Sequence, residues 1–350
     1  MGTQRILVAI VLIGVVGGGF LLLRGNSKSA TAKLHISTWS NYYPEDLIEE
    51  FTDKTGIKVE LSYISSNEEL FSKLRAGATG YDIIQPSDYM VRQMAKLGML
   101  AELDHTQLPH LSHLDPFFAK PSYDPTLKHS VPFTWGTTGI TVNTEKIKVS
   151  ENDLSWRLLI DSPDPRHTSL LDDMREVFAS VFFLQGISPN TTDLNAMKAA
   201  IQTLTILKPK LLTFSGEPRP LVMGREVYIA HSYSTDGVQM AVDDPKLKFF
   251  IPKEGAIVWT DNFAIPSTSR EPALAHRFID YFLDPENALK ISTQNLLATP
   301  NATVKEALPE TLRNNPNIYP SPETMKKLHW LEDIGDNLRK MNELWTKLKS

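Results

Sequence analysis

Two hydrophobic patterns alternate along residues 33–98: runs of apolar, β-branched residues, and apolar residues spaced three or four apart. They predict strands over 33–39, 57–64 and 81–87, each followed by a helix. The first helix would bury Leu47, Ile48 and Phe51 and end at Gly56. Strands that alternate with helices usually form a mostly parallel sheet covered by helices, so we expect an α/β fold.

Residues 253–266, KEGAIVWTDNFAIP, predict a further strand. Because side chains alternate across a strand, Ile257, Trp259, Asp261 and Phe263 would share one face. A carboxylate on such an apolar segment must be paired, reach water or bind a cation, because burial of a lone charge is costly. A strand-end aspartate in water beside a core tryptophan is the alternative interpretation.

The composition is that of a folded globular protein large enough for two domains. The chain has 350 residues, of which 41% are hydrophobic and 22% charged. It has no cysteine, which excludes disulfides, thiol catalysis and cysteine-bound metals. The net charge is −5; beyond residue 32 there are 33 basic and 41 acidic residues, a balance of −8. This charge disfavours nucleic acid as a partner and favours a cationic one.

Residues 1–32 have the pattern of an export signal. Arg5 precedes an apolar run over 6–23, and the small residues Ala30 and Ala32 follow a polar stretch. This order predicts a signal peptide cleaved after Ala32. The apolar run is almost long enough to span a bilayer, so an uncleaved signal anchor is the alternative. Both interpretations place the folded part outside the cytoplasmic membrane, in the periplasm.

Seven segments carry a resemblance to one protein family: FTDKTGIKVE, SSNEELFSKL, YDIIQPSDYMVRQMAKLGML, VPFTWGTTGITVN (131–143), LLDDMREVF (170–178), KEGAIVWTDNFAIP (253–266) and YPSPETMKKLHW (319–330). In this order they resemble the spermidine/putrescine-binding family of bacterial extracytoplasmic solute-binding proteins, which supply ABC importers. The resemblance covers almost everything after residue 33.

The resemblance implies the type II-like periplasmic-binding-protein fold, with two α/β lobes and the ligand in the cleft between them. One lobe would contain 33–138 plus 261–306, and the other 139–260 plus 307–350. Residues 131–143 are rich in Thr and Gly, as expected of a strand that crosses between lobes. The tail from Pro322 is expected to be helical, with one apolar face formed by Ile334, Leu338, Met341, Trp345 and Leu348.

Two acidic positions have both a structural and a functional interpretation. Asp173 followed three residues later by Glu176 forms a capping box, in which both carboxylates can satisfy backbone donors at a helix start. The resemblance instead implies that both acids face ligand amines. Asp236 lies in Thr-Asp-Gly, which is a good turn sequence, although some relatives that bind putrescine have an aspartate there.

The resemblance implies a site of aromatic walls, acids and small polar residues, suited to a polyamine. Its methylenes need flat apolar surface, and its ammonium groups gain from π faces and carboxylates. The implied ligand-binding residues are Trp39, Ser40, Asn41, Tyr42, Ser87, Tyr89, Asp173, Glu176, Ser215, Tyr233, Asp236, Trp259 and Asp261. The chain departs from the family at Asn41, Leu297 and Leu331, where acidic, aromatic and amide side chains are usual. These three would lie toward one end of the ligand.

We therefore expect a solute-binding protein that captures a polyamine, with spermidine favoured and putrescine next. Its partners would be this ligand and the permease subunits of an ABC importer, and it would contact the membrane only through its N-terminal segment or the permease. We expect no catalysis, cofactor or metal. A polyamine sensor acting on a membrane signalling partner is the alternative, followed by a hydrolase that uses paired carboxylates.

Overall fold

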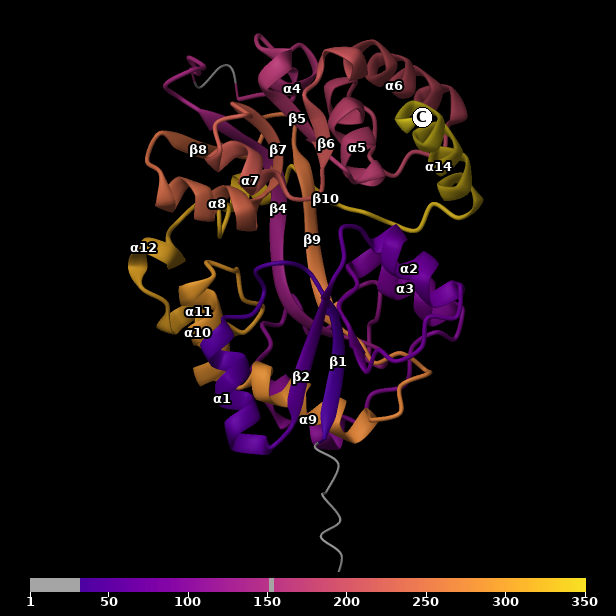
Figure 1. The fold of residues 1–350 in the computed structure, drawn as a ribbon, viewed down its shortest axis with the longest axis vertical. Helices are drawn as coiled ribbons and strands as arrows, with labels where there is room; N and C mark the ends of the chain where they lie inside the picture. Colours follow the sequence, from indigo (N-terminus) through magenta and orange to yellow (C-terminus); the bar gives the residue numbers. More distant parts are fainter. Residues whose placement is uncertain (1–31, 151–153) are drawn as a thin grey trace, which may run out of the picture.

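The structure, a computed structural model, describes residues 32–150 and 154–350. Except for Ala32, the predicted export signal lies outside the described residues. The fold has two lobes stacked along its long axis, and the strands β4 (Val131–Asn143) and β9 (Ala256–Phe263) run from one lobe into the other (Figure 1). Among the described residues, no helix combines the length and apolar character needed to cross a membrane.

A small parallel sheet forms the base of the first lobe. Its strands are β1 (Lys33–Thr38), β2 (Lys58–Tyr63) and β3 (Ile83–Ile84), in the order β2-β1-β3. The connecting helices are α1 (Glu45–Thr55), α2 (Asn67–Arg75) and α3 (Asp88–Lys96). Both pairings are parallel, which confirms the predicted alternation. The expected strand over 81–87 is too long, because Pro86 has no backbone N–H to continue the ladder.

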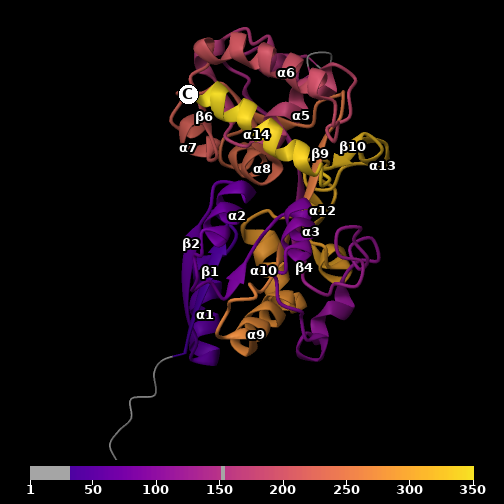
Figure 2. The same cartoon turned by 90° about the vertical axis from the view of Figure 1, so that its right-hand side faces the viewer.

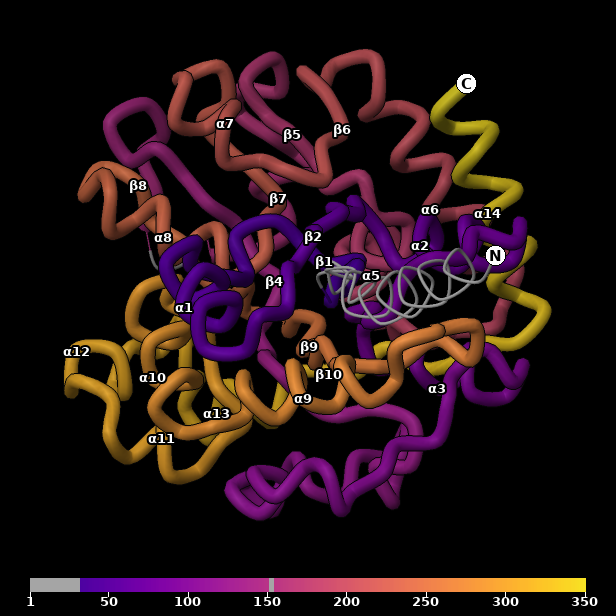
Figure 3. The backbone as a smooth tube through the Cα atoms, turned by 60° about the horizontal axis from the view of Figure 1, so that its bottom comes forward, coloured from indigo at the N-terminus to yellow at the C-terminus, as the bar shows by residue number. Residues whose placement is uncertain are grey.

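The first lobe is completed by a segment that is far away in the sequence. It contains α9 (Pro272–Leu283), α10 (Pro285–Gln294) and α11 (Ala302–Ala307), after which the short helix α12 (Glu310–Arg313) follows. Figure 3 shows α9 and α10 beside α1. The contact is aromatic: the rings of Phe51 on α1 and Phe278 on α9 lie 5.2 Å apart, edge to face. The chain thus leaves the first lobe and returns to it.

The second lobe is built on a larger sheet with the strand order β10-β9-β4-β7-β5-β6, and β8 pairs with β4. The remaining strands are β5 (Thr168–Leu171), β6 (Thr213–Ser215), β7 (Ile229–Tyr233), β8 (Leu247–Phe250) and β10 (Leu328–Trp330). The helices are α4 (Arg157–Ile160), α5 (Met174–Leu184), α6 (Leu194–Leu207), α7 (Pro218–Met223), α8 (Ser234–Asp243) and α14 (Asp336–Lys349). Every residue of β4 and β9 is buried.

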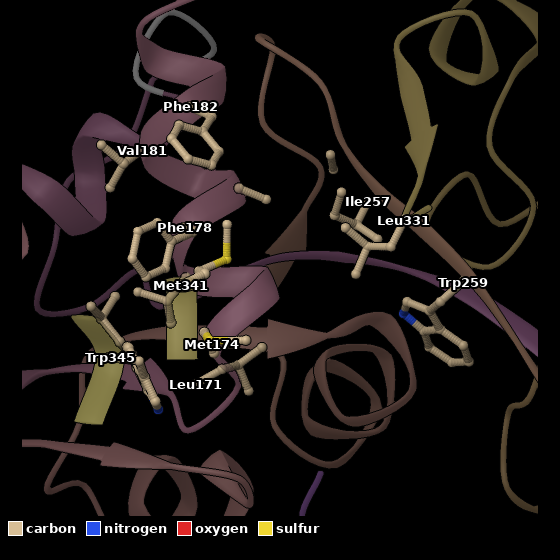
Figure 4. Close-up of a cluster of buried hydrophobic side chains, with 14 of the residues drawn as sticks. Leu171, Met174, Phe178, Val181, Phe182, Ile257, Trp259, Leu331, Met341 and Trp345 are labelled. Carbon is tan, nitrogen blue, oxygen red and sulfur yellow. The ribbon is translucent and has the colours of Figure 1, made fainter. Parts of the chain in front are cut away.

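The largest apolar cluster surrounds α5. Figure 4 shows Phe178 and Phe182 on this helix, with Ile257, Trp259 and Leu331 at the far side of the cluster. Figure 2 shows α14 lying against α5 and α6. The Trp345 indole of α14 meets the Phe214 ring edge to face, at 5.3 Å.

The expected continuous helix from Pro322 is wrong. A one-turn helix, α13 (Pro322–Met325), is followed by the strand β10, which pairs in parallel with β9, and the long helix begins only at Asp336. Ile334 therefore precedes the helix. Met341, Trp345 and Leu348 are buried on its inner face, as the helical spacing predicted.

Candidate functional site

A narrow cavity with a volume of about 60 Å³ lies between the lobes. We call it the first cavity. It is lined by Trp39, Ser40, Tyr42, Ile64, Ser65, Asn67, Ser87, Asp88, Tyr89, Asp173, Glu176, Gly216, Glu217, Tyr233, Thr235, Asp236, Trp259, Asp261 and Leu331. Most of these residues come from the ends of strands and the starts of helices in both lobes, where α/β proteins usually bind ligands, while Trp259 and Asp261 lie within β9.

The structure brings most of the expected site residues to this cavity. Eleven of the thirteen line it: Trp39, Ser40, Tyr42, Ser87, Tyr89, Asp173, Glu176, Tyr233, Asp236, Trp259 and Asp261. Ser215 does not, because its hydroxyl binds the Glu217 backbone, donating to the carbonyl at 2.9 Å and accepting from the N–H at 3.1 Å. Asn41 is exposed, in a left-handed conformation with φ of 61°, and does not line the cavity either.

The three departures from the family do not gather at one end of this cavity. Leu331 lines it. Leu297 is only 2% exposed and belongs to the apolar core of the first lobe. Asn41 lies outside the lining, where its backbone carbonyl accepts a hydrogen bond of 2.7 Å from the Asn295 side chain.

Asp261 on β9 is buried and held by two hydroxyl groups. The Ser87 hydroxyl donates to one carboxylate oxygen at 2.5 Å, and the Tyr42 hydroxyl donates to the other. The Asn67 side chain in turn donates to Ser87 at 2.9 Å. Burial raises the pKa of Asp261 to about 6, although both hydroxyl groups favour the charged form. Asp261 is therefore a buried acid held by side chains of the first lobe, without a cationic partner in the lining of this cavity.

Asp173 and Glu176 lie at the start of α5. The Glu176 N–H donates to the Asp173 carboxylate at 3.2 Å, as in the first half of a capping box, and the Tyr233 hydroxyl donates to its other oxygen at 3.2 Å. Within the described structure, the Asp173 N–H donates no hydrogen bond to the Glu176 carboxylate, so the second half of the capping box is missing. Burial, and then the charge of Asp173, hold the pKa of Glu176 well above its usual range. Capping thus explains Asp173 but leaves the Glu176 carboxylate unexplained.

Asp236 does not lie in a tight turn, because the Thr-Asp-Gly sequence forms the first turn of α8. Its side chain faces the first cavity. Burial raises the pKa of Asp236 to about 6, against the opposing effect of Arg219. The turn interpretation is therefore wrong, and a helix start again presents an acid to the cavity.

Aromatic rings form much of the wall. The Tyr233 ring meets the Trp259 indole edge to face at 5.9 Å. The Trp39 indole N–H donates to the Gln85 carbonyl at 2.9 Å, which fixes its ring plane. The Tyr89 hydroxyl donates to Glu68 at 3.0 Å. These hydrogen bonds orient the rings, so their faces can be offered to a ligand.

Several lining residues were missed by the sequence analysis, above all Asp88 and Glu217. Asp88 begins α3 and Glu217 precedes α7, so each is a typical acid at a helix start. For Asp88, the only signal in the sequence is its position between Ser87 and Tyr89, both of which were expected at the site. Burial raises the pKa of Asp88 to about 8.

The charged residues that line the first cavity are all acidic. Six of its lining residues are acids, and none of the described residues that line it is Lys, Arg or His. Carboxylates that are buried together raise one another's free energy. The buried Arg175, behind the lining, offsets part of this cost for Asp88, Asp173 and Glu176, and a bound cation would offset more of it. Among the described residues, no cluster of three or more acids and histidines has the arrangement to hold a metal ion. The geometry therefore suits an organic cation that lies between aromatic rings.

Comparison with known proteins agrees with this geometry. Residues 46–320 match the family described as bacterial extracellular solute-binding protein. The chain is 36% identical over 325 residues to spermidine/putrescine-binding periplasmic protein 1 of Haemophilus influenzae, covering 92% of this chain and 90% of that protein. It is 32% identical over 361 residues to the putrescine-binding periplasmic protein PotF of Escherichia coli, covering 97% of each.

A solved structure shows the same fold. The putative spermidine/putrescine ABC transporter from Listeria monocytogenes superimposes with a TM-score of 0.86 at 34% identity, over 91% of this chain and 98% of that one. The structure thus has two α/β lobes with a cavity between them, and the family match covers most of the chain. The chain belongs to the bacterial extracellular solute-binding protein family, whose members bind a solute and do not transform it.

Proposed function

We propose that this protein captures a linear polyamine outside the cytoplasmic membrane, in the periplasm, and delivers it to an ABC importer. The observation that carries the proposal is the first cavity, with six acids, five aromatic residues and no basic residue among its described lining. The relatives named for spermidine and putrescine support the same ligand class. The permease subunits of the importer are the proposed partners.

The cavity offers a distinct environment to each part of a polyamine. One ammonium group would meet Asp261, whose carboxylate is already oriented by Ser87 and Tyr42. Another would meet Asp173 and Glu176 at the start of α5. The methylene segments between them would lie along Trp259 and the other rings. Burial of each methylene stabilises the complex by about 0.8 kcal/mol.

Spermidine is the proposed preferred ligand, and putrescine the next. Spermidine has more methylene surface to place against the rings, and Leu331 is an apolar part of the lining. Its third ammonium group also has a further acid available, because Asp88 lines the cavity. Putrescine would fill a smaller part of the site.

Ligand capture would close the lobes about the strands that join them. The proposed boundaries assign 33–138 plus 261–306 to one lobe and 139–260 plus 307–350 to the other. Residues from both lobes line the first cavity, so a cation there completes charge pairs that an open form leaves in water.

A thermal-shift panel tests the proposal. Putrescine, spermidine and spermine should raise the melting temperature of the purified protein, because a ligand that binds only the folded state stabilises it. Sugars, amino acids and iron should not. Asp261→Asn is the control for the site, and the shift should shrink in this variant. The absence of a shift with every polyamine would contradict the proposal.

A further inference from the structure

A larger cavity lies against the first one, and its open space is about 320 Å³. We call it the second cavity. It is lined by Asp88, Tyr89, Arg92, Phe117, Phe118, Lys120, Pro121, Ser122, Tyr123, Thr260, Trp330, Leu331, Glu332 and Asp333. Asp88, Tyr89 and Leu331 line both cavities, so they form the wall that the two share. Figure 2 shows β10 and α3, which border it, on the same side of the molecule.

The inner part of the second cavity is polar, and one of its hydroxyl groups has no hydrogen-bond partner among the described residues. The Asp88 carboxylate is 2% exposed and accepts hydrogen bonds from the N–H groups of Tyr89, at 2.6 Å, and Thr260, at 3.3 Å. The Thr260 hydroxyl is buried and makes no hydrogen bond within the described structure. Each Asp88 oxygen thus already accepts one N–H group, whereas the Thr260 hydroxyl lacks a partner that an ammonium group in this cavity would supply.

Its outer part is aromatic and mixed in charge. Phe117 and Trp330 lie with their ring centroids 6.1 Å apart, and Phe117 is 55% exposed. The Glu332 carboxylate is exposed and makes no ion pair with any described residue, while its backbone is held by Arg175 and Asn190. An acid beside one exposed and one half-buried aromatic ring suits an alkylammonium group.

Two cations also line this cavity. The Arg92 guanidinium donates to the Ser122 carbonyl, and its charge acts on Asp333, which also lines the cavity. Lys120 is exposed and has no ion pair among the described residues. Lys120 therefore opposes a cationic ligand at the opening without neutralising the buried acid.

We propose that the second cavity is a second site for an alkylammonium group. This inference rests on the proposed function and extends it: the group would be either the outer amine of a polyamine longer than the first cavity holds, or a separate alkylamine. In the first case, Leu331 provides an apolar surface past which methylenes can run from one cavity to the other. A tetraamine such as spermine would then be long enough to reach both cavities.

Isothermal titration calorimetry with putrescine, spermidine and spermine tests this inference, using the ratio of spermine affinity to putrescine affinity. Trp330→Ala should lower the ratio about tenfold, because it removes one π face and apolar surface. Lys120→Glu should raise it severalfold, because it replaces an opposing charge with a favourable one. Neither residue lines the first cavity, so putrescine affinity should stay within about twofold of the wild type.

The two sources of the ammonium group are separated by propylamine, titrated into protein saturated with putrescine. One-to-one binding of propylamine that weakens in Trp330→Ala would identify a separate alkylamine, and a changed spermine ratio would identify the outer arm of a long polyamine. Lys120 is exposed, so its variant should fold even if Trp330→Ala does not. Polyamine binding with an unchanged ratio and no propylamine binding would overturn this inference alone. If the wild-type protein bound no polyamine, the proposed function would be overturned as well.

Discussion

At the residue scale, the acids of the first cavity should serve binding more than folding. Replacing Glu176 by Gln or Asp261 by Asn keeps the side-chain shape and removes a charge that would meet an ammonium group. Loss of such a partner in a desolvated site costs about 2–5 kcal/mol of binding free energy. Calorimetric titration with spermidine measures the loss.

The same substitutions should not weaken the free protein. Burial already disfavours the charged form of both acids, so a neutral amide should leave the melting temperature unchanged or raise it. Asp161→Asn, an exposed acid outside the cavity, is the matched control and should change neither quantity. Wild-type binding by Glu176→Gln would mean that this acid serves only the start of α5.

The residues that were hard to predict show which information the sequence lacks. Asp88 and Glu217 resemble ordinary acids at helix starts, and only the packing of the second lobe against the first makes them part of a cavity wall. Ser215 was expected at the site, yet its hydroxyl is used by the local backbone. A short polar side chain can hydrogen-bond either to the local backbone or to a ligand, and the sequence does not show which of these it does.

At the element scale, β4 makes room for the Trp259 indole of the site through Gly136. Gly136 pairs with Trp259 across the sheet, and a Cβ atom added to it would lie 2.5 Å from the indole Cζ2 and 2.6 Å from the Ser234 hydroxyl. Gly136→Ala should therefore displace the indole. Overpacking of this kind costs about 1–3 kcal/mol of stability. Spermidine affinity should fall about fivefold or more in the folded variant, as measured by calorimetry.

Gly139 provides the matched control on the same strand. A Cβ atom there would lie 2.4 Å from the Phe250 carbonyl oxygen and 2.6 Å from the Phe249 ring, and none of these residues lines the first cavity. Gly139→Ala should lower the melting temperature without changing spermidine affinity in the protein that remains folded. If Gly136→Ala and Gly139→Ala lost the same amount of affinity, the loss would come from the lower stability of the protein and not from displacement of the indole.

A third prediction concerns α14. Trp345 is 8% exposed and packs against Phe214, so Trp345→Ala should lower the free energy of unfolding by about 3–5 kcal/mol. Denaturant titration measures this change. Lys347→Ala, on the exposed side of the same helix, should have an effect within about 0.5 kcal/mol. If the two variants were equally stable, the packing of α14 would contribute little to the second lobe.

Elements with a local signal were predicted well, and those that depend on distant partners were not. The end of α1 at Gly56 was predictable, because a left-handed glycine, here with φ of 72°, stops a helix. The break before α14 was not, because β10 exists through its pairing with β9, where Leu328 lies opposite Ala256. The hydrophobic period continues through this break, so periodicity alone extended the helix too far.

At the scale of the whole molecule, the buried acids link binding to pH. Burial raises the pKa of Asp236 and Asp261 to about 6, that of Glu68 to about 7 and that of Asp88 to about 8. In the unfolded chain these acids titrate near pH 4. The folded state thus binds more protons between about pH 4 and 8, and the free protein should lose stability as the pH rises through this window.

Binding should show the opposite dependence on pH. Polyamine amines stay protonated near neutral pH, and a bound ammonium group favours the charged form of each acid that it meets. Binding must then release protons, and each proton fully released makes the affinity rise tenfold per pH unit. Spermidine affinity should therefore increase from pH 5.5 to 7.5, while the stability of the free protein decreases.

Calorimetry in two buffers with different ionisation enthalpies at pH 6.5 counts the protons released. Asp261→Asn should release fewer protons than the wild type, because one of the acids that titrates near pH 6 is gone. The control Asp161→Asn should release the same number as the wild type, since its side chain lies outside the cavity. Proton uptake on binding, or an affinity that falls as the pH rises, would mean that the ligand does not meet these acids.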